Sequence, residues 1–130
     1  MARLTPEQQE LLKGLNFANL ATLREDGSPQ VTPVWIDYVD GEILINTRKG
    51  RTKDRNMRRD PRVSLSVLDQ ANPYTYVAIT GNAVIVDEGE RAWAHINDLQ
   101  EKYHGNRNFP RDDGAVRVIL RIEPELVVGE

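Results

Sequence analysis

The side chains best suited to chemistry lie where an apolar run ends at Ile45 and a basic, glycine-containing turn begins. Good helix formers follow the turn, so free backbone N–H groups and the positive end of a helix dipole lie beside hydroxyl and cationic side chains. Such groups converge on one anion, and a phosphate suits them. The alternative is a short helix with a solvated basic face. The candidate ligands are Thr47, Arg51, Thr52 and Lys53.

The distribution of charge supports an anionic ligand at this turn. Residues 48–62 contain eight basic and two acidic side chains, although the whole chain has a net charge of −3. The one strongly positive segment of an acidic protein attracts anions. Nucleic acid is not the expected partner, because the overall balance is acidic and no basic stripe carries interleaved aromatic residues.

Most other kinds of site are excluded by composition. The chain has no cysteine, so disulfides, thiolate metal sites and cysteine nucleophiles are absent. Its two histidines, His95 and His104, have no carboxylate at ligand spacing, so no metal site is expected. His95 is predicted to be partly exposed beside a helix stripe, and His104 to lie near the helix C-terminus. No nucleophile elbow, Walker loop or Rossmann glycine pattern occurs, and no catalytic residue is assigned.

The elements that must position the basic turn are mostly strands. Alternating apolar residues and turn dipeptides predict six strands, the first three forming an antiparallel meander. Gly81 inside the fifth strand indicates a bulge or a barrel corner. Helices are predicted from Pro6, with Thr5 as N-cap, then over 52–59 and 88–103. The strands are expected at 17–23, 31–36, 42–47, 63–67, 76–86 and 116–122, with a further extended run at 126–128.

Length and composition predict one domain over residues 1–130. The chain is 39% hydrophobic and 28% charged, as in ordinary globular proteins. No apolar run reaches the roughly 20 residues of a membrane span, and no signal peptide is evident, so a cytoplasmic protein is expected. A domain of this size removes only about two thirds of its unfolded surface from water, which favours dimerisation.

Residues 46–53 and 56–65 resemble the pyridoxamine-phosphate-oxidase-like split β-barrels. The likeness extends over nearly the whole chain, from the Leu-Ala-Thr-Leu run at 20–23 to the Arg-Ile-Glu-Pro run at 121–124. Within that superfamily, residues 72–74 and 98–105 are similar to the branch of deazaflavin-dependent reductases, which use coenzyme F420. The resemblance implies a mainly β fold: a six-stranded antiparallel split barrel of the FMN-binding type, with about three helices.

The resemblance also implies a set of cofactor-binding residues. Arg51, Thr52 and Lys53 would hold the cofactor phosphate, with Asn46 and Thr47 at the end of the preceding strand. The cofactor would lie at the interface of a homodimer, and Tyr74 and Tyr76 of the partner chain would close its pocket. Ordinary strand packing or surface exposure is the alternative for both tyrosines, and filling of the dimer core is the alternative for Trp35. The ring of the cofactor would lie, largely through backbone groups, along Gln30, Val31, Thr32, Pro33, Val34 and Trp35.

The function implied is hydride transfer from reduced F420 to a small organic acceptor. An FMN-dependent oxidoreductase of the same superfamily is the alternative, and a non-catalytic module that binds an anion or cofactor is an alternative of another class. True pyridoxamine-phosphate oxidase is less favoured, because the chain is short for that enzyme. A surplus of cations around Lys53 favours the deazaflavin, whose tail carries carboxylates beyond its phosphate. These cations are Arg48, Lys49, Arg55, Arg58 and Arg59.

Overall fold

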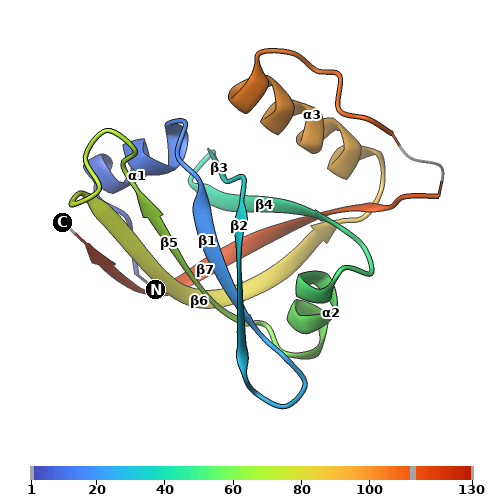
Figure 1. The fold of residues 1–130 in the computed structure, drawn as a ribbon, viewed down its shortest axis with the longest axis horizontal. Coiled ribbons are helices and arrows are strands. Elements are labelled where there is room, and N and C mark those ends of the chain that lie inside the picture. The colour runs from blue at the N-terminus through green and yellow to red at the C-terminus, as the bar shows by residue number, and fades with distance from the viewer. Residues whose placement is uncertain (1, 112–113, 130) are drawn as a thin grey trace.

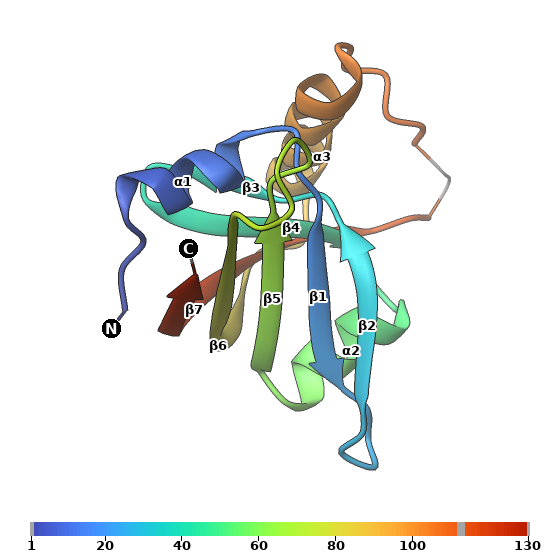
Figure 2. The ribbon, with the colours of Figure 1, turned by 60° about the vertical axis from the view of Figure 1, so that its left-hand side comes forward.

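A single antiparallel sheet contains every strand that the computed structural model describes, over residues 2–111 and 114–129. The sheet is curled, as Figures 1 and 2 show, and its strand order is β2-β1-β5-β6-β7-β4-β3. Its concave side holds the apolar core. The strands are β1 (Ala18–Leu23), β2 (Pro29–Val34), β3 (Asp37–Val39), β4 (Glu42–Arg48), β5 (Arg62–Leu68), β6 (Tyr76–Asp87) and β7 (Arg117–Gly129). The helices are α1 (Pro6–Lys13), α2 (Thr52–Arg59) and α3 (Glu90–His104).

The mainly β class and the three helices are confirmed, but the strands number seven among the described residues. The added strand, β3, has three residues, too few for a period-two pattern to show. The predicted meander is wrong, because β4 pairs with β3 and β7 and not with β2. After β2 the chain passes through Trp35 and Ile36 into β3, and the turn at Asp40 and Gly41, both with positive φ, makes the hairpin with β4. The two C-terminal runs form one strand, β7.

Strand alternation determines which side chains reach the core. In β5, Val63, Leu65 and Val67 are buried, whereas the residues between them are at least partly exposed. The predicted capping box starts α1, with Thr5 and Gln8 exchanging two hydrogen bonds of 2.9 and 3.2 Å. The helix then covers one end of the core with Leu11 and Leu12.

The bulge predicted at Gly81 is confirmed. The β6–β7 register shifts between Thr80 and Gly81, where the backbone carbonyl of Glu123 approaches so closely that a Cβ atom would overlap it. Only glycine permits this approach. The bulge lets β6 and β7 bend together, which curls the sheet.

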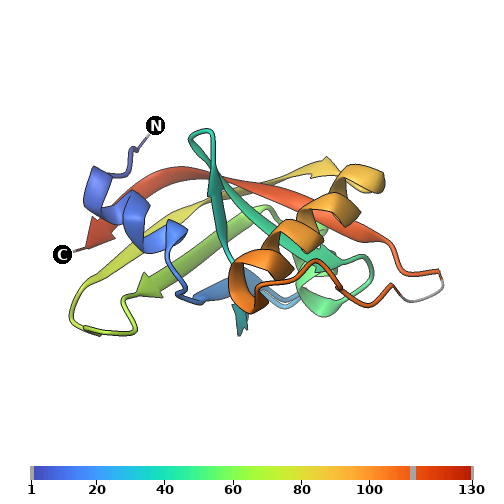
Figure 3. The same ribbon diagram turned by 90° about the horizontal axis from the view of Figure 1, so that it is seen from above.

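Helices α2 and α3 lie at different places on the curled sheet. Figure 1 shows α2 between β4 and β5 near one end of the sheet, and Figure 3 shows α3 lying across β4 and β7. Contacts of α3 with β4 and β7 and of α2 with β1 agree with this arrangement. In the described ranges, no helix has the length and apolar character needed to cross a membrane. The cytoplasmic location stays a prediction.

Candidate functional site

A pocket of about 360 Å³ opens where the ends of β2 and β4 approach α2 and α3. One end of the pocket is cationic and the other is aromatic and aliphatic. The strands and α3 form its walls, and the turn and first residues of α2 contribute two of its cations. Its lining residues are Phe17, Pro33, Val34, Trp35, Asn46, Thr47, Arg48, Arg51, Lys53, Ile96, Phe109 and Arg117.

The structure brings more than half of the sequence-predicted site residues into this pocket. These are Pro33, Val34, Trp35, Asn46, Thr47, Arg51 and Lys53. The predicted residues that do not line it are Gln30, Val31, Thr32, Thr52, Tyr74 and Tyr76.

The predicted residues outside the pocket differ in their surroundings. Gln30 points to α2, where its Oε1 atom lies 3.5 Å from Asn56 Nδ2. Thr52 is exposed on the first turn of α2. Tyr74 is 86% exposed, and Tyr76 is half-buried at the start of β6. Within one chain the tyrosines therefore do not contribute to the site.

The open edge of the sheet runs along β2 and offers backbone groups. Pro29 and Pro33 lack an N–H and pair with Leu23 and Asn19 of β1, so both occupy positions where the ladder requires no donor. Val31 lies midway between them and has the same parity. Its N–H and C=O therefore face away from β1, and its side chain is 61% exposed. This edge can hydrogen-bond a flat ligand through main-chain atoms.

The turn before α2 is held from within the helix. The carboxylate of Asp54, 1% exposed, accepts a hydrogen bond of 2.8 Å from the N–H of Gly50. Gly50 has a φ of 94°, a conformation that favours glycine. The other contact of Asp54 is with Arg58, whose Nε atom lies 3.0 Å away. The turn thus directs Arg51 and Lys53 toward the pocket.

Positively charged side chains gather at one end of the pocket. Among the described residues, no carboxylate lies within ion-pair distance of Arg51, Lys53 or Arg117. Burial, with the charges of Arg51 and Arg117, lowers the pKa of Lys53 below 10.5. Burial, with the charges of Arg51 and Arg48, lowers the pKa of Arg117 to about 10. An anion bound between these groups would relieve the repulsion of their charges.

The surplus cations of the sequence mostly lie elsewhere. Lys49 and Arg58 both pair with Glu88, at 3.0 and 2.8 Å. Arg55 donates to the carbonyl of Gly50, and Arg59 donates to the carbonyl of Leu23. Of the five residues that we counted as surplus, only Arg48 lines the pocket. Arg117 takes their place from β7.

The other end of the pocket is an aromatic wall. Trp35 stacks on Tyr103 with ring centroids 5.2 Å apart, and Phe17 stacks on the same tyrosine at 5.4 Å. Phe109 meets Trp35 edge to face at 6.3 Å. Such a wall suits a planar, apolar group. Trp35 thus contacts α3 and the loop after it within its own chain.

Four further lining residues were not predicted from the sequence: Phe17, Ile96, Phe109 and Arg117. The only available signal was Arg117, a charged residue that interrupts an apolar strand pattern. The prediction for His95 is wrong, because its side chain is 5% exposed and not partly exposed. Burial is tolerated because both ring nitrogens have partners, Asp37 at 3.0 Å and Asn46 at 3.2 Å.

The sequence profile of pyridoxamine 5'-phosphate oxidase matches residues 4–128, almost the whole chain. This chain belongs to the pyridoxamine 5'-phosphate oxidase family. Members share the split-barrel fold of a superfamily of oxidoreductases. A solved structure named as an F420 reductase is 31% identical, with a TM-score of 0.84, and the match covers 96% of this chain and 98% of that one. A conserved hypothetical protein from Mycobacterium tuberculosis is 29% identical, with a TM-score of 0.77, over 98% of this chain and 84% of that one.

Proposed function

We propose that this family member is an F420-dependent reductase, which transfers a hydride from reduced F420 to a small organic acceptor. The observation that carries the proposal is the cationic end of the pocket. Arg51 just before α2, Lys53 in α2 and Arg117 in β7 are brought together with no carboxylate of the described chain to neutralise them. A ligand with a phosphate and further carboxylates meets that need better than a ligand with one phosphate alone.

The pocket also fits the rest of such a cofactor. The Thr47 hydroxyl is buried in the lining and has no hydrogen-bond partner among the described residues, as expected of a group that binds a ligand. The exposed edge at Val31 can pair with polar atoms at the rim of a tricyclic ring. The similarity to the structure named as an F420 reductase supports the deazaflavin over FMN.

The cofactor, when bound, supplies a two-electron hydride donor that reacts poorly with oxygen. The chain's own residues then have three tasks. Arg51, Lys53 and Arg117 hold the anionic tail, and the segment from Pro33 to Trp35 orients the ring. The aromatic wall excludes water and receives the acceptor. None of the described lining residues carries a carboxylate, so these residues contribute binding and orientation.

A homodimer completes the proposal. Ten side chains on the outer face of β2, β1, β5, β6 and β7 form two cross-strand rows without one charged residue, on a chain that is 28% charged. Figure 2 shows β2, β1 and β5 uncovered by any helix on the side facing the viewer. The outer sheet face, as we call it, consists of Pro33, Asn19, Ser66, Ala78 and Val128 in one row and Val31, Ala21, Ser64, Thr80 and Leu126 in the other.

Packing of the outer sheet face against a second copy would place the pocket at the dimer interface. Pro33 belongs both to that face and to the pocket lining, so the two surfaces are continuous. Tyr74 and Tyr76, which lie outside the pocket of their own chain, would then be available to the pocket of the partner. Uncharged faces of this kind are typical of permanent interfaces.

The test is a fluorescence titration of the purified protein with oxidised F420 and, separately, with FMN. We expect tighter binding of F420, weakened about 30-fold in Lys53→Ala, the equivalent of about 2 kcal/mol for a charge-assisted contact. Lys13→Ala is the matched control, because it removes the same charge from an exposed residue of α1. Tighter binding of FMN would transfer the proposal to the FMN-dependent alternative. Binding of both without turnover of any acceptor would favour a cofactor-binding module.

A further inference from the structure

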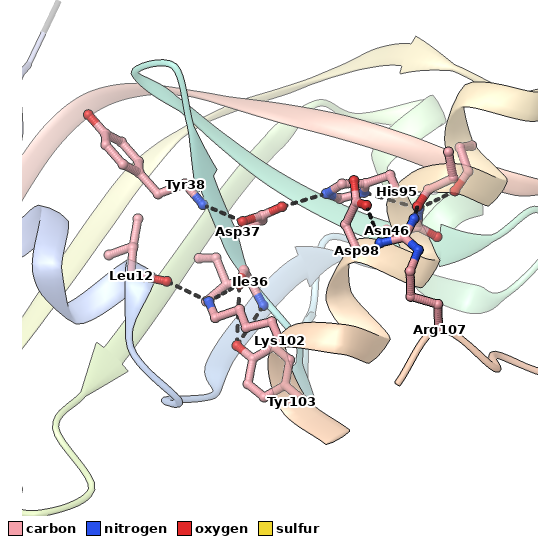
Figure 4. Close-up of polar contacts among 12 residues, drawn as sticks. Leu12, Ile36, Asp37, Tyr38, Asn46, His95, Asp98, Lys102, Tyr103 and Arg107 are labelled. Carbon is pink, nitrogen blue, oxygen red and sulfur yellow. Dashed lines mark hydrogen bonds and ion pairs between the residues drawn. The ribbon is translucent and has the colours of Figure 1, made fainter. Parts of the chain in front are cut away.

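A series of hydrogen bonds links Asp37 of β3 to Arg117 at the cationic end of the pocket. Arg117 Nε lies 2.9 Å from Asn46 Oδ1, and Asn46 Nδ2 lies 3.2 Å from His95 Nδ1. His95 Nε2 lies 3.0 Å from Asp37 Oδ2. The four residues belong to β7, β4, α3 and β3. Figure 4 shows the hydrogen bonds that join Asp37, His95 and Asn46.

The chemistry of the donors leaves one arrangement of protons. Arg117 Nε can only donate, so the Asn46 atom facing it must be the carbonyl oxygen. Asn46 Nδ2 then faces the Ala92 carbonyl, 2.9 Å away, and His95 Nδ1. His95 Nδ1 must therefore accept, which places the ring proton on Nε2, where it is donated to Asp37. With the ring proton on Nε2 alone, each donor in this series of hydrogen bonds faces an acceptor.

Moving the His95 ring proton or rotating the Asn46 amide would disturb the hydrogen bond that holds Arg117. A His95 ring with a proton on Nδ1 would set two donors against each other. Rotation of the Asn46 amide would relieve that clash, but it would turn Nδ2 toward the N–H of Arg117 and Oδ1 toward the carbonyl of Ala92. The Arg117 anchor is therefore intact only while His95 accepts at Nδ1.

We propose that Asp37 and His95 are positioning residues for the cofactor site, which hold the Arg117 guanidinium in place through the amide of Asn46. Asp37 selects the tautomer of His95, His95 orients Asn46, and Asn46 binds Arg117. The Arg117 guanidinium, whose Cζ atom lies 5.1 Å from the centroid of the Phe109 ring, then has its other nitrogens available to the ligand. The effect on ligand binding rests on the proposed function, whereas the effect on Arg117 itself does not.

The first experiment measures hydrogen exchange of the Arg117 Nε–H by NMR, with Arg117→Ala used to assign the signal. We expect exchange about fivefold faster in His95→Leu, as for the loss of one buried hydrogen bond. His95→Gln should restore slow exchange, because glutamine can both donate to Asp37 and accept from Asn46. His95→Phe, closer in shape to imidazole, replaces His95→Leu if the latter does not fold. Unchanged exchange in a folded variant would overturn the proposal.

The second experiment is a double-mutant cycle on F420 affinity. His95→Leu should weaken binding about tenfold in the wild-type background and have almost no effect in Arg117→Ala, because it acts through Arg117. A merely structural role would weaken binding equally in both backgrounds, and that result would overturn the proposal. If the wild-type protein binds no F420, the proposed function fails, and the exchange measurement still decides whether His95 positions Arg117.

Discussion

The carboxylate of Asp54 accepts a hydrogen bond from the backbone N–H of Gly50 at 2.8 Å, so a residue inside α2 fixes the turn that precedes the helix. The same carboxylate pairs with Arg58 one turn later. Helix and turn therefore form one unit, and the direction of Arg51 and Lys53 depends on it.

Replacement of Asp54 should therefore affect both stability and binding. We expect Asp54→Ala to lower the free energy of unfolding by about 2–3 kcal/mol, because it leaves the Gly50 N–H without its acceptor and removes one of the two carboxylate partners of Arg58. Urea denaturation measures the loss. Asp98→Ala is the control, since Asp98 is 55% exposed and pairs with the exposed Arg107, and it should cost less than about 1 kcal/mol. Equal losses would contradict the role assigned to Asp54.

The crowding of cations predicts a trade between stability and binding. Lys53→Met keeps the length of the side chain but removes a half-buried charge, and we expect it to stabilise the ligand-free protein by about 1 kcal/mol at pH 7. The same variant should bind F420 more weakly. A variant that is merely damaged would lose stability as well as affinity.

The pH dependence of that gain follows from the lowered pKa of Lys53 in the folded state. The unfolded chain holds the Lys53 proton more tightly than the folded chain does. The Lys53 charge therefore destabilises the folded protein by its full amount below the lowered pKa, and by less as the pH rises through that pKa toward 10.5. The stability difference between Lys53→Met and wild type should therefore shrink between pH 7 and pH 10.5 (the ordinary value), as followed by urea denaturation. A difference that grows with pH would show that the charge of Lys53 is not the cause.

Two buried hydroxyls without partners offer a matched pair of variants. Thr47→Val and Thr32→Val each remove such a hydroxyl while keeping the shape of the side chain, so neither should destabilise the ligand-free protein. Only Thr47 lines the pocket. We expect about fivefold weaker F420 binding in Thr47→Val, the equivalent of one hydrogen bond. Thr32→Val should change the affinity little. Similar affinities in both variants would remove Thr47 from the site.

The dimer proposal is tested at the middle of the outer sheet face. Ala78 lies between Ser66 and Val128 in the first row, and Ala78→Arg should convert a dimer to a monomer because it buries an unpaired charge. Light scattering gives the mass in solution. Ala94→Arg, the same substitution on the exposed face of α3, should leave the dimer intact. A dimer that survives Ala78→Arg must use another surface.

Local features of the chain were accessible from the sequence. The capping box at Thr5 and the basic turn before α2 each depend on residues close together in the chain, and the bulge was indicated by a single glycine inside a strand pattern. Period-two alternation likewise located the longer strands, because it reports burial of one face whatever the partner. The family resemblance was carried by these same local motifs.

Contacts between segments far apart in the sequence could not be predicted. A hydrophobic period does not show which strands lie side by side, so the pairing of β4 with β7 was missed. Arg117, the pocket cation that β7 contributes, was missed with it. His95 is buried because Asp37 of β3 and Asn46 of β4 hydrogen-bond its two ring nitrogens. No local sequence pattern predicts these partners. The sequence by itself determined a basic, phosphate-suited turn within a mainly β chain. Only the tertiary structure decided which cations meet there, because like charges converge only where long-range packing forces them together.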